Sequence, residues 1–259
     1  MRIVIDIGNS EVTVGLAEGA SLRGHWRLTT VSERTPDEWA LQLEAFIVRA
    51  GHSPEEIHAA CIASVAPGVT AAMLAAVRLG ITPHVGVVSP DAPLPLVLDV
   101  DEPWAVGADR IANALGVLDQ RGRDAIVVDL GTATTFDCVT ADRRFIGGAI
   151  MPGLRTSAEQ LIRRAAKLTA TELVLPTRAI GRTTTEHIRA GVLYGTVDAI
   201  DGMVDRIRAE WPTPTAPVVV GTGGLAALLA PISRTLDAVD PDLTLHGLRV
   251  AADALGLPG

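Results

Sequence analysis

Short apolar runs separated by turn residues predict an α/β protein. Three runs near the start are bounded by turn signals at Gly8, Asn9 and Gly19. The motif Thr-Pro-Asp-Glu at residues 35–38 offers an N-cap, a proline at the first helical position and a capping-box glutamate, so it predicts a helix that ends at Gly51. The first half is thus expected to hold strands at residues 3–7, 12–17, 24–30, 59–65 and 85–89, and helices at 36–50, 69–79 and 108–120.

The second half of the chain predicts a similar order of elements. Ile-Val-Val-Asp-Leu-Gly at residues 126–131 resembles Ile-Val-Ile-Asp-Ile-Gly at residues 3–8, at an offset of 123 positions (126 − 3). We therefore expect a duplicated α/β unit, with domains at residues 1–118 and 119–259. The expected strands are 125–129, 134–139, 145–150, 218–220 and 235–239, and the expected helices are 156–166, 185–210, 225–229 and 248–255.

In each half the first strand ends on an aspartate that is followed by a glycine and small polar residues. These pairs are Asp6 with Gly8 and Asp129 with Gly131. A carboxylate can hold a hydrated cation, glycine lets main-chain amides approach an oxyanion, and hydroxyls add donors. Two equivalent turns of this kind predict a polyphosphate clamp at an interdomain cleft. The alternative is that each is an ordinary tight turn.

A third segment, residues 103–110, places a carboxylate and a guanidinium side by side where a helix begins. Asp109 can orient or deprotonate an attacking hydroxyl, and Arg110 can bind a carboxylate or a phosphoryl oxygen. Spacing alone favours a plainer interpretation, in which Asp109 is a helix N-terminal charge and Arg110 forms a surface ion pair.

The motif Gly-Thr-Gly-Gly-Leu-Ala at residues 221–226 fits a dinucleotide-binding fingerprint. Only 38 residues follow Gly221 (259 − 221), too few for the remaining strands of a Rossmann domain. The motif predicts either a close backbone approach to an adenosine group or an ordinary turn at the start of a helix.

Composition removes several function classes. The chain has 22 basic and 30 acidic residues, a net charge of −8, which argues against sequence-independent nucleic-acid binding. Lys167 is the only lysine and lies in no glycine-rich setting, which excludes a P-loop and a protein kinase. Cys61 and Cys138 are too few for a disulfide framework and predict a cytoplasmic protein. The apolar stretches contain Pro and Gly, and the histidines form no zinc motif, so neither a membrane partner nor a zinc site is expected.

Taken together, these segments resemble the type III pantothenate kinases over nearly the whole chain. The motifs that carry the resemblance lie at residues 6–10, 107–114, 129–137, 147–154, 180–184 and 222–225. It implies the fold of the acetate and sugar kinase, heat-shock ATPase and actin superfamily, in which duplicated ribonuclease H-like (actin-like ATPase) domains flank an ATP cleft.

The resemblance also implies the chemistry. The reaction would be ATP-dependent phosphorylation of pantothenate to 4′-phosphopantothenate, the first step of coenzyme A biosynthesis. Asp109 would accept the proton, which it can do with an ordinary low pKa, and Asp129 would bind a monovalent cation, K⁺ or NH₄⁺, while Mg²⁺ arrives with ATP. The implied ATP-binding residues are Asp6, Ile7, Gly8, Asn9, Ser10, Glu11, Val12, Thr13 and Thr132. The implied pantothenate-binding residues are Gly107, Ala108, Asp109, Arg110 and Thr184, the last acting across the subunit interface of a homodimer.

Four positions depart from the family's usual pattern. Ser10 replaces a threonine, Val100 a tyrosine near pantothenate, Thr183 an asparagine and Ala190 a serine. Val100 and Thr183 keep open a kinase for another small hydroxyl compound. A non-catalytic nucleotide-binding interaction protein is the further alternative, against which intact Asp6, Asp109 and Asp129 argue.

Overall fold

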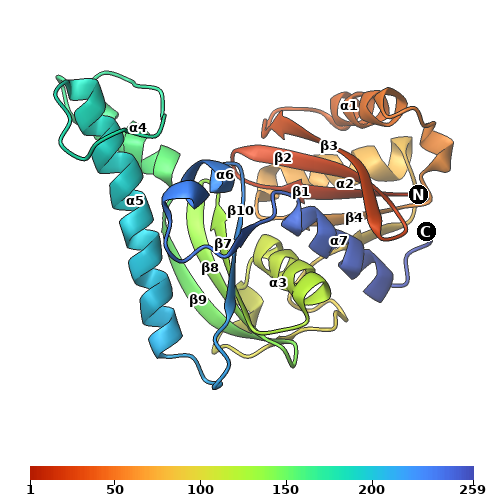
Figure 1. The fold of residues 1–259 in the computed structure, drawn as a ribbon. Helices are drawn as coiled ribbons and strands as arrows, with labels where there is room; N and C mark the ends of the chain where they lie inside the picture. Colours follow the sequence, from red (N-terminus) through yellow and green to blue (C-terminus); the bar gives the residue numbers. More distant parts are fainter. The chain divides into compact units, whose positions relative to one another are not determined.

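The computed structural model describes residues 1–259, and the chain packs into two compact units (Figure 1). Unit 1 comprises Met1–Gly122, Asp142–Ile146 and Leu243–Gly259, and unit 2 comprises Arg123–Ala141 and Gly147–Asp242. The last helix of the chain therefore packs with the first half. The domain bounds 1–118 and 119–259 stay a prediction.

Unit 1 is built on a five-stranded sheet of order β3-β2-β1-β4-β5. β1 pairs antiparallel with β2 and parallel with β4. Helices α1 (Pro36–Arg49) and α2 (Pro67–Gly80) cover one face, and α3 (Ala108–Arg121) and α7 (Leu243–Ala254) lie on the other (Figure 1). The strands are β1 (Arg2–Ile7), β2 (Glu11–Glu18), β3 (Ser21–Thr29), β4 (Ala59–Ser64) and β5 (Val85–Val87).

The predicted start of the first helix is confirmed. The backbone N–H of Thr35 donates to the Glu38 carboxylate at 2.7 Å, and the backbone N–H of Glu38 donates to the Thr35 hydroxyl at 3.3 Å. This capping box directs Trp39, Leu43 and Ile47 into a core that they share with the side chains of β1 and β2. Alternate residues of β1 face this core, because successive side chains of a strand point to opposite faces of the sheet.

Helices α3 and α7 cross at backbone contact, through a glycine on each. A Cβ on Gly247 would lie 1.7 Å from the carbonyl oxygen of Ala112, and a Cβ on Gly116 would lie 2.5 Å from that of Leu243. The Thr244 hydroxyl donates to Asn113 Oδ1 at 2.7 Å, which adds a polar contact at the crossing. The position of α3 is therefore fixed by a helix that is far away in sequence.

Unit 2 repeats the sheet of unit 1. The six strands of its sheet lie in the order β11-β10-β7-β8-β9-β6, and the first five match β5-β4-β1-β2-β3. β7 begins 123 residues after β1 (125 − 2), and β9 begins 123 residues after β3 (144 − 21). The predicted duplication is confirmed. The strands are β7 (Ala125–Leu130), β8 (Ala133–Thr140), β9 (Arg144–Pro152), β10 (Val218–Thr222) and β11 (Ala238–Val239).

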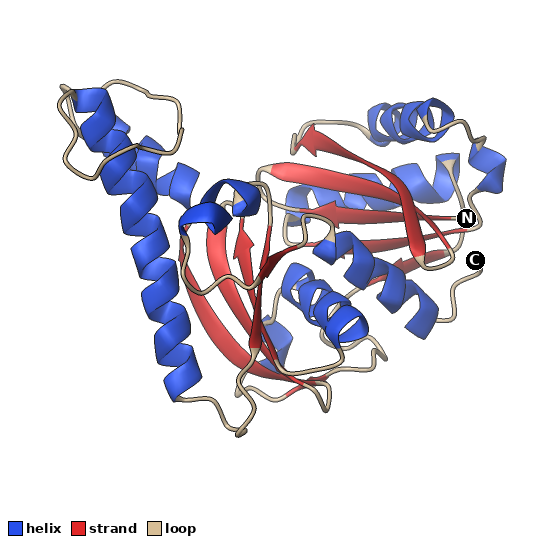
Figure 2. Cartoon of the chain, viewed as in Figure 1, coloured by secondary structure: helices blue, strands red, loops and turns tan.

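The helices of unit 2 gather beside this sheet. Figure 2 shows α5 (Thr184–Ala209) as one long helix, with α4 (Leu154–Arg164) packed beside it. The third helix, α6 (Ala226–Leu229), is short and follows β10 directly. No helix combines the length and the apolar composition that crossing a bilayer requires.

The structure differs from the prediction in the bounds of several elements and in one strand that was not predicted. The last helix begins at Leu243 rather than residue 248, because Gly247, a poor helix former, lies inside it and serves the crossing with α3. Helix α4 begins at Leu154 rather than residue 156, since Gly153 occupies the N-cap without a capping side chain. The strand β6 (Val97–Leu98) was not predicted, because two residues in a proline-rich loop carry no periodicity and pair only with the start of β9.

Candidate active site

The turn between β1 and β2 holds the residues that the resemblance assigns to ATP. Asp6 and Ile7 end β1, the turn spans Gly8 to Ser10, and β2 begins with Glu11, Val12 and Thr13. The Gly8 N–H donates to the Glu11 carbonyl at 2.9 Å, and a Cβ on Gly8 would lie 3.0 Å from that oxygen. Asn9, Ser10 and Glu11 are exposed, so the turn presents its polar groups to solvent.

Thr30, the residue after β3, braces this turn. Its backbone N–H donates to the Ser10 carbonyl at 3.0 Å, and its hydroxyl donates to the Gly8 carbonyl at 2.7 Å. Two hydrogen bonds from one residue fix the turn's carbonyl groups on the side of β3. A turn held in this way is pre-organised for a ligand.

The equivalent turn of unit 2 lies between β7 and β8. Asp129 lies in β7, one residue before its end, and the Gly131 N–H donates to the Ala133 carbonyl at 3.1 Å. Thr132 is exposed at the tip of the turn, and its carbonyl accepts hydrogen bonds from the segment that follows β9. The structure thus brings Asp129 and Thr132 together at one edge of the sheet.

Oxygen donors gather around Asp129. Thr222 on β10 lies in register with Asp129, and Gly223, at φ +83°, approaches so closely that a Cβ would lie 2.6 Å from Asp129 Oδ1. The Thr222 hydroxyl, on the same face of the sheet as Asp129, is buried without a hydrogen-bond partner. A carboxylate with an unpaired hydroxyl on the neighbouring strand is a donor set that suits a hard cation. The chain holds no group of three or more His, Cys, Asp or Glu side chains that could bind a metal ion.

The motif at residues 221–226 therefore packs against β7, the strand that pairs with β10. Gly223 is required because its backbone is left-handed and because a Cβ there would clash with Asp129 and with the backbone of Leu130. The short helix that follows confirms that this is not a Rossmann turn. The close backbone approach seen here is to β7, and the approach to an adenosine group that the motif predicts stays a prediction.

Asp109 and Arg110 lie in the first turn of α3, in unit 1. Asp109 Oδ1 accepts a hydrogen bond from the Arg110 N–H at 2.8 Å, and a Cβ on Gly107 would lie 2.5 Å from the same oxygen. That Cβ would also lie 3.5 Å from the side chain of Val65, whose N–H donates to the Ile7 carbonyl at 3.0 Å. The start of α3 therefore lies beside Val65, the residue that is hydrogen-bonded to the end of β1.

The Asp109 carboxylate is partly buried, and burial raises its pKa above the usual value for an aspartate. The hydrogen bond from the Arg110 N–H and the charge of Arg110 lower the pKa and offset only part of this effect. The expectation of an ordinary low pKa was wrong, because sequence spacing does not reveal how deeply the first turn of α3 is packed. A raised pKa makes this carboxylate a stronger base than an exposed aspartate.

The Arg110 guanidinium stacks on the ring of Phe145, with 5.2 Å between its central carbon and the ring centroid. Phe145 is fully buried. The plainer interpretation from sequence, an exposed ion pair, did not anticipate this aromatic support. The stacking limits the orientations of the Arg110 guanidinium, and therefore the directions in which its N–H groups can donate.

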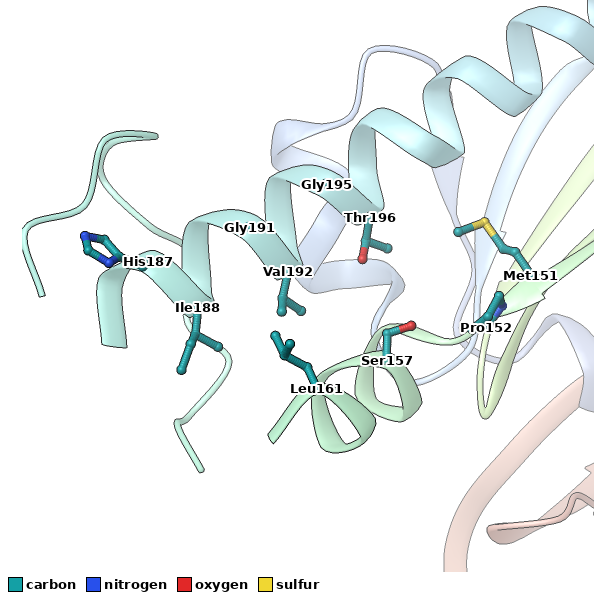
Figure 3. Close-up of a pocket in the computed structure, with 10 residues that line it drawn as sticks. All are labelled: Met151, Pro152, Ser157, Leu161, His187, Ile188, Gly191, Val192, Gly195 and Thr196. Atoms are coloured by element: carbon teal, nitrogen blue, oxygen red, sulfur yellow. The ribbon is translucent and has the colours of Figure 1, made fainter. Parts of the chain in front are cut away.

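Thr184, the remaining predicted substrate residue, is exposed and begins α5. The Thr183 hydroxyl caps the helix by accepting the Glu186 N–H at 3.2 Å. Threonine in place of the usual asparagine therefore keeps a helix cap. Beside this end of α5, a cavity of about 320 Å³ is lined mainly by α4 and α5, and Figure 3 shows Ser157 and Leu161 facing Val192 and Thr196.

The site residues thus fall into two groups. The β1–β2 turn and Gly107, Ala108, Asp109 and Arg110 belong to unit 1, whereas Asp129, Thr132 and Thr184 belong to unit 2. Sequence reasoning missed the contributions of Phe145 and Thr222, because each meets its neighbour in the site through side-chain packing or sheet pairing rather than through a local motif.

A family model identifies the family of the chain. The model described as type III pantothenate kinase matches residues 2–206, which include both turns and the start of α3. The chain belongs to the type III pantothenate kinase family. A type III pantothenate kinase from Thermomicrobium roseum is 44% identical over 257 residues, covering 98% of each chain.

Two solved structures show the fold of this type III pantothenate kinase family member at low sequence identity. One is a conserved putative Baf family transcriptional activator from Campylobacter jejuni, with a TM-score of 0.60, 19% identity and coverage of 97% of each chain. The other is component A of (R)-2-hydroxyglutaryl-CoA dehydratase from Acidaminococcus fermentans, with a TM-score of 0.56 and 14% identity, covering 99% of this chain and 96% of that one. The predicted actin-like ATPase fold, with duplicated α/β domains, is confirmed.

Proposed function

We propose that this protein transfers the γ-phosphoryl group of ATP, supplied with Mg²⁺, to the primary hydroxyl of pantothenate, with Asp109 as the proton acceptor. The product is 4′-phosphopantothenate, and the reaction is the first step of coenzyme A biosynthesis. The observation that carries the proposal is a family match that spans both Asp-x-Gly turns and the start of α3. Both cysteines are free and buried, and burial raises the pKa of the Cys61 thiol to about 12, which suits a protein of the reducing cytoplasm.

The two turns bind ATP in this proposal. Phosphoryl transfer asks the protein mainly for positioning and for neutralisation of charge. The residues from Asp6 to Thr13 and Thr132 supply backbone N–H groups and hydroxyls on turns whose shape is already fixed by hydrogen bonds. Mg²⁺ supplies charge neutralisation at the phosphates. A chain whose only lysine is Lys167 can handle ATP in this way.

Asp109 performs the acid–base step. Its Oδ1 is held by the Arg110 N–H, which leaves Oδ2 to accept the proton of the pantothenate hydroxyl. The proton moves from that hydroxyl to the carboxylate as the oxygen attacks the γ-phosphorus. Arg110, aimed by Phe145, binds the pantothenate carboxylate or an oxygen of the transferring phosphoryl group.

Asp129 binds a monovalent cation, K⁺ or NH₄⁺, in this proposal. The support is the donor set, in which the buried hydroxyl of Thr222 lies on the strand residue that pairs with Asp129. A cation held there adds positive charge beside Thr132 and the phosphates that it binds.

In this proposal the protein is a homodimer, and pantothenate is bound by Gly107, Ala108 and Thr184. Thr184 contributes to the binding site of the partner subunit. The support is the face formed by α4 and the first half of α5. Leu161 is 43% exposed there, and nothing lies within 4 Å of a Cβ placed on Gly191 or Gly195, so a second chain can approach the helix backbone closely.

We expect Gly195→Arg to convert a dimer into a monomer, because a long charged side chain would fill the space above α5. Multi-angle light scattering measures the molar mass against 27.0 kDa per chain. Ala209→Arg is the matched control, since Ala209 is exposed on the same helix about 20 Å further along. A monomeric wild type, or a dimer that survives Gly195→Arg, would contradict this interface.

The function itself is tested by a coupled assay of ADP release. With ATP, Mg²⁺, K⁺ and pantothenate, we expect ADP and phosphopantothenate in equal amounts, and we expect the rate to fall when Na⁺ replaces K⁺. A panel of other small hydroxyl compounds serves as the control for substrate identity. A folded protein that binds ATP yet turns over no pantothenate in K⁺ or NH₄⁺ would refute the proposal.

A further inference from the structure

The segment from Gly153, after β9, into the first turn of α4 holds the β7–β8 turn in place. The Thr132 carbonyl oxygen accepts two hydrogen bonds from this segment, one from the Gly153 N–H at 3.1 Å and one from the Thr156 hydroxyl at 2.7 Å. Both donors come from residues more than 20 positions after Thr132 in sequence. This carbonyl is therefore fixed by tertiary contacts and not only by the turn itself.

The contact leaves no space for a larger residue. A Cβ on Gly153 would lie 2.4 Å from the carbonyl oxygens of both Gly131 and Thr132. Both oxygens are backbone atoms and cannot rotate away as a side chain would. Glycine at this position is thus required by the close approach of the two segments.

A brace of the same kind is present in unit 1. There the Thr30 N–H donates to the Ser10 carbonyl, and the Thr30 hydroxyl donates to the Gly8 carbonyl. Gly153 stands 123 positions after Thr30 (153 − 30), the offset of the duplication. In both units the first residue after the third strand donates its N–H to the turn. Because Gly153 has no hydroxyl, Thr156 supplies the second bond in unit 2.

The two hydrogen bonds to the Thr132 carbonyl control the direction in which the turn's backbone N–H groups point. A trans peptide group is planar, so the carbonyl of one residue and the N–H of the next point in opposite directions. No peptide bond in the chain is cis. A Thr132 carbonyl held against Gly153 and Thr156 therefore turns the Ala133 N–H away from that segment. The same constraint limits the backbone angles of Thr132, which orient its hydroxyl.

We propose that Thr156 is a positioning residue for ATP, whose hydroxyl keeps the β7–β8 turn in its phosphate-binding shape. The proposal rests on the proposed function, in which Thr132 binds ATP. Thr156 itself touches the turn's carbonyl, so it acts through Thr132 rather than on the nucleotide. Loss of its hydroxyl lets the peptide group after Thr132 rotate and weakens binding of ATP without altering the pantothenate residues.

The test compares Thr156→Val, which removes the hydroxyl, with Thr156→Ser, which keeps it. For Thr156→Val we expect the KM for ATP, and the Kd for ATP measured by calorimetry, to rise about 5- to 10-fold, the effect of one hydrogen bond. The KM for pantothenate should stay unchanged, and Thr156→Ser should restore ATP binding to within about twofold of wild type.

Thr82→Val is the matched control. Like that of Thr156, the Thr82 hydroxyl donates to a backbone carbonyl, here that of His58 at 2.9 Å, and it lies on a buried segment outside the site. We expect it to lower the melting temperature without changing the Kd for ATP. An unchanged Kd in Thr156→Val, a Ser variant that does not restore binding, or an equal rise in the KM for pantothenate would overturn the proposal. Because calorimetry needs no turnover, failure of the brace is distinguishable from failure of the kinase function.

Discussion

Asp109→Asn is expected to lower kcat by about 10²- to 10⁴-fold, the contribution of a positioned proton acceptor. The amide is nearly the same size as the carboxylate, and its oxygen can still accept the Arg110 N–H. The KM for ATP should remain near that of wild type, since the turn residues are untouched. Steady-state kinetics with both substrates varied measure the effect.

The stability of this variant has a predictable sign. Burial raises the pKa of Asp109, so the folded state favours the protonated carboxyl and loses stability as the pH rises through that raised pKa. Asparagine is neutral at every pH and removes this cost, so the melting temperature at neutral pH should not fall. A loss of activity without a loss of stability separates a chemical role from a structural one.

The pH profile supplies a second readout. In the wild type, kcat should fall on acidification through the raised pKa of Asp109, at a higher pH than an exposed aspartate would give. In Asp109→Asn this acid limb should be absent. Lys167→Met is the control, because Lys167 is exposed and outside both turns, and it should leave turnover unchanged. Near-native turnover in Asp109→Asn would remove the residue from its proposed role.

The fold could be predicted from local patterns because each half of the sequence shows the same order of elements. The pairs β1 with β7 and β3 with β9 keep one offset, and the capping box at residues 35–38 sets the start of α1 as predicted. The start of α7 was predicted too late, since the helix tolerates Gly247 only because α3 packs against it. Contacts between distant elements override helix propensity there.

The site could be predicted where its chemistry is local in sequence. Each Asp-x-Gly turn can be recognised in the sequence because the strand, the carboxylate and the glycine lie within a few residues of one another. The supports of the site could not be predicted in this way. Phe145 reaches Arg110, Thr222 meets Asp129 and Thr156 holds Thr132 only after the sheet and α4 have formed. The raised pKa of Asp109 belongs to the same class, because it depends on burial.

Gly247→Ala is expected to lower the melting temperature by about 5–10 °C, the effect of overpacking a close helix crossing by about 2–3 kcal/mol. The added Cβ would lie 1.7 Å from the carbonyl oxygen of Ala112, a backbone atom of α3 that can move only if the helix moves. Thermal unfolding followed by circular dichroism measures the shift. Displacement of α3 also moves Asp109, so kcat should fall in the fraction that remains folded.

The sign of this effect is diagnostic, because glycine to alanine inside a helix ordinarily stabilises by about 0.5–1 kcal/mol. Gly202→Ala in α5 is the matched control, since nothing lies within 4 Å of a Cβ at that position. It should melt at or slightly above the temperature of wild type. If Gly247→Ala behaved like Gly202→Ala, α7 would not fix α3, and the alignment of Asp109 would have to come from other contacts of α3.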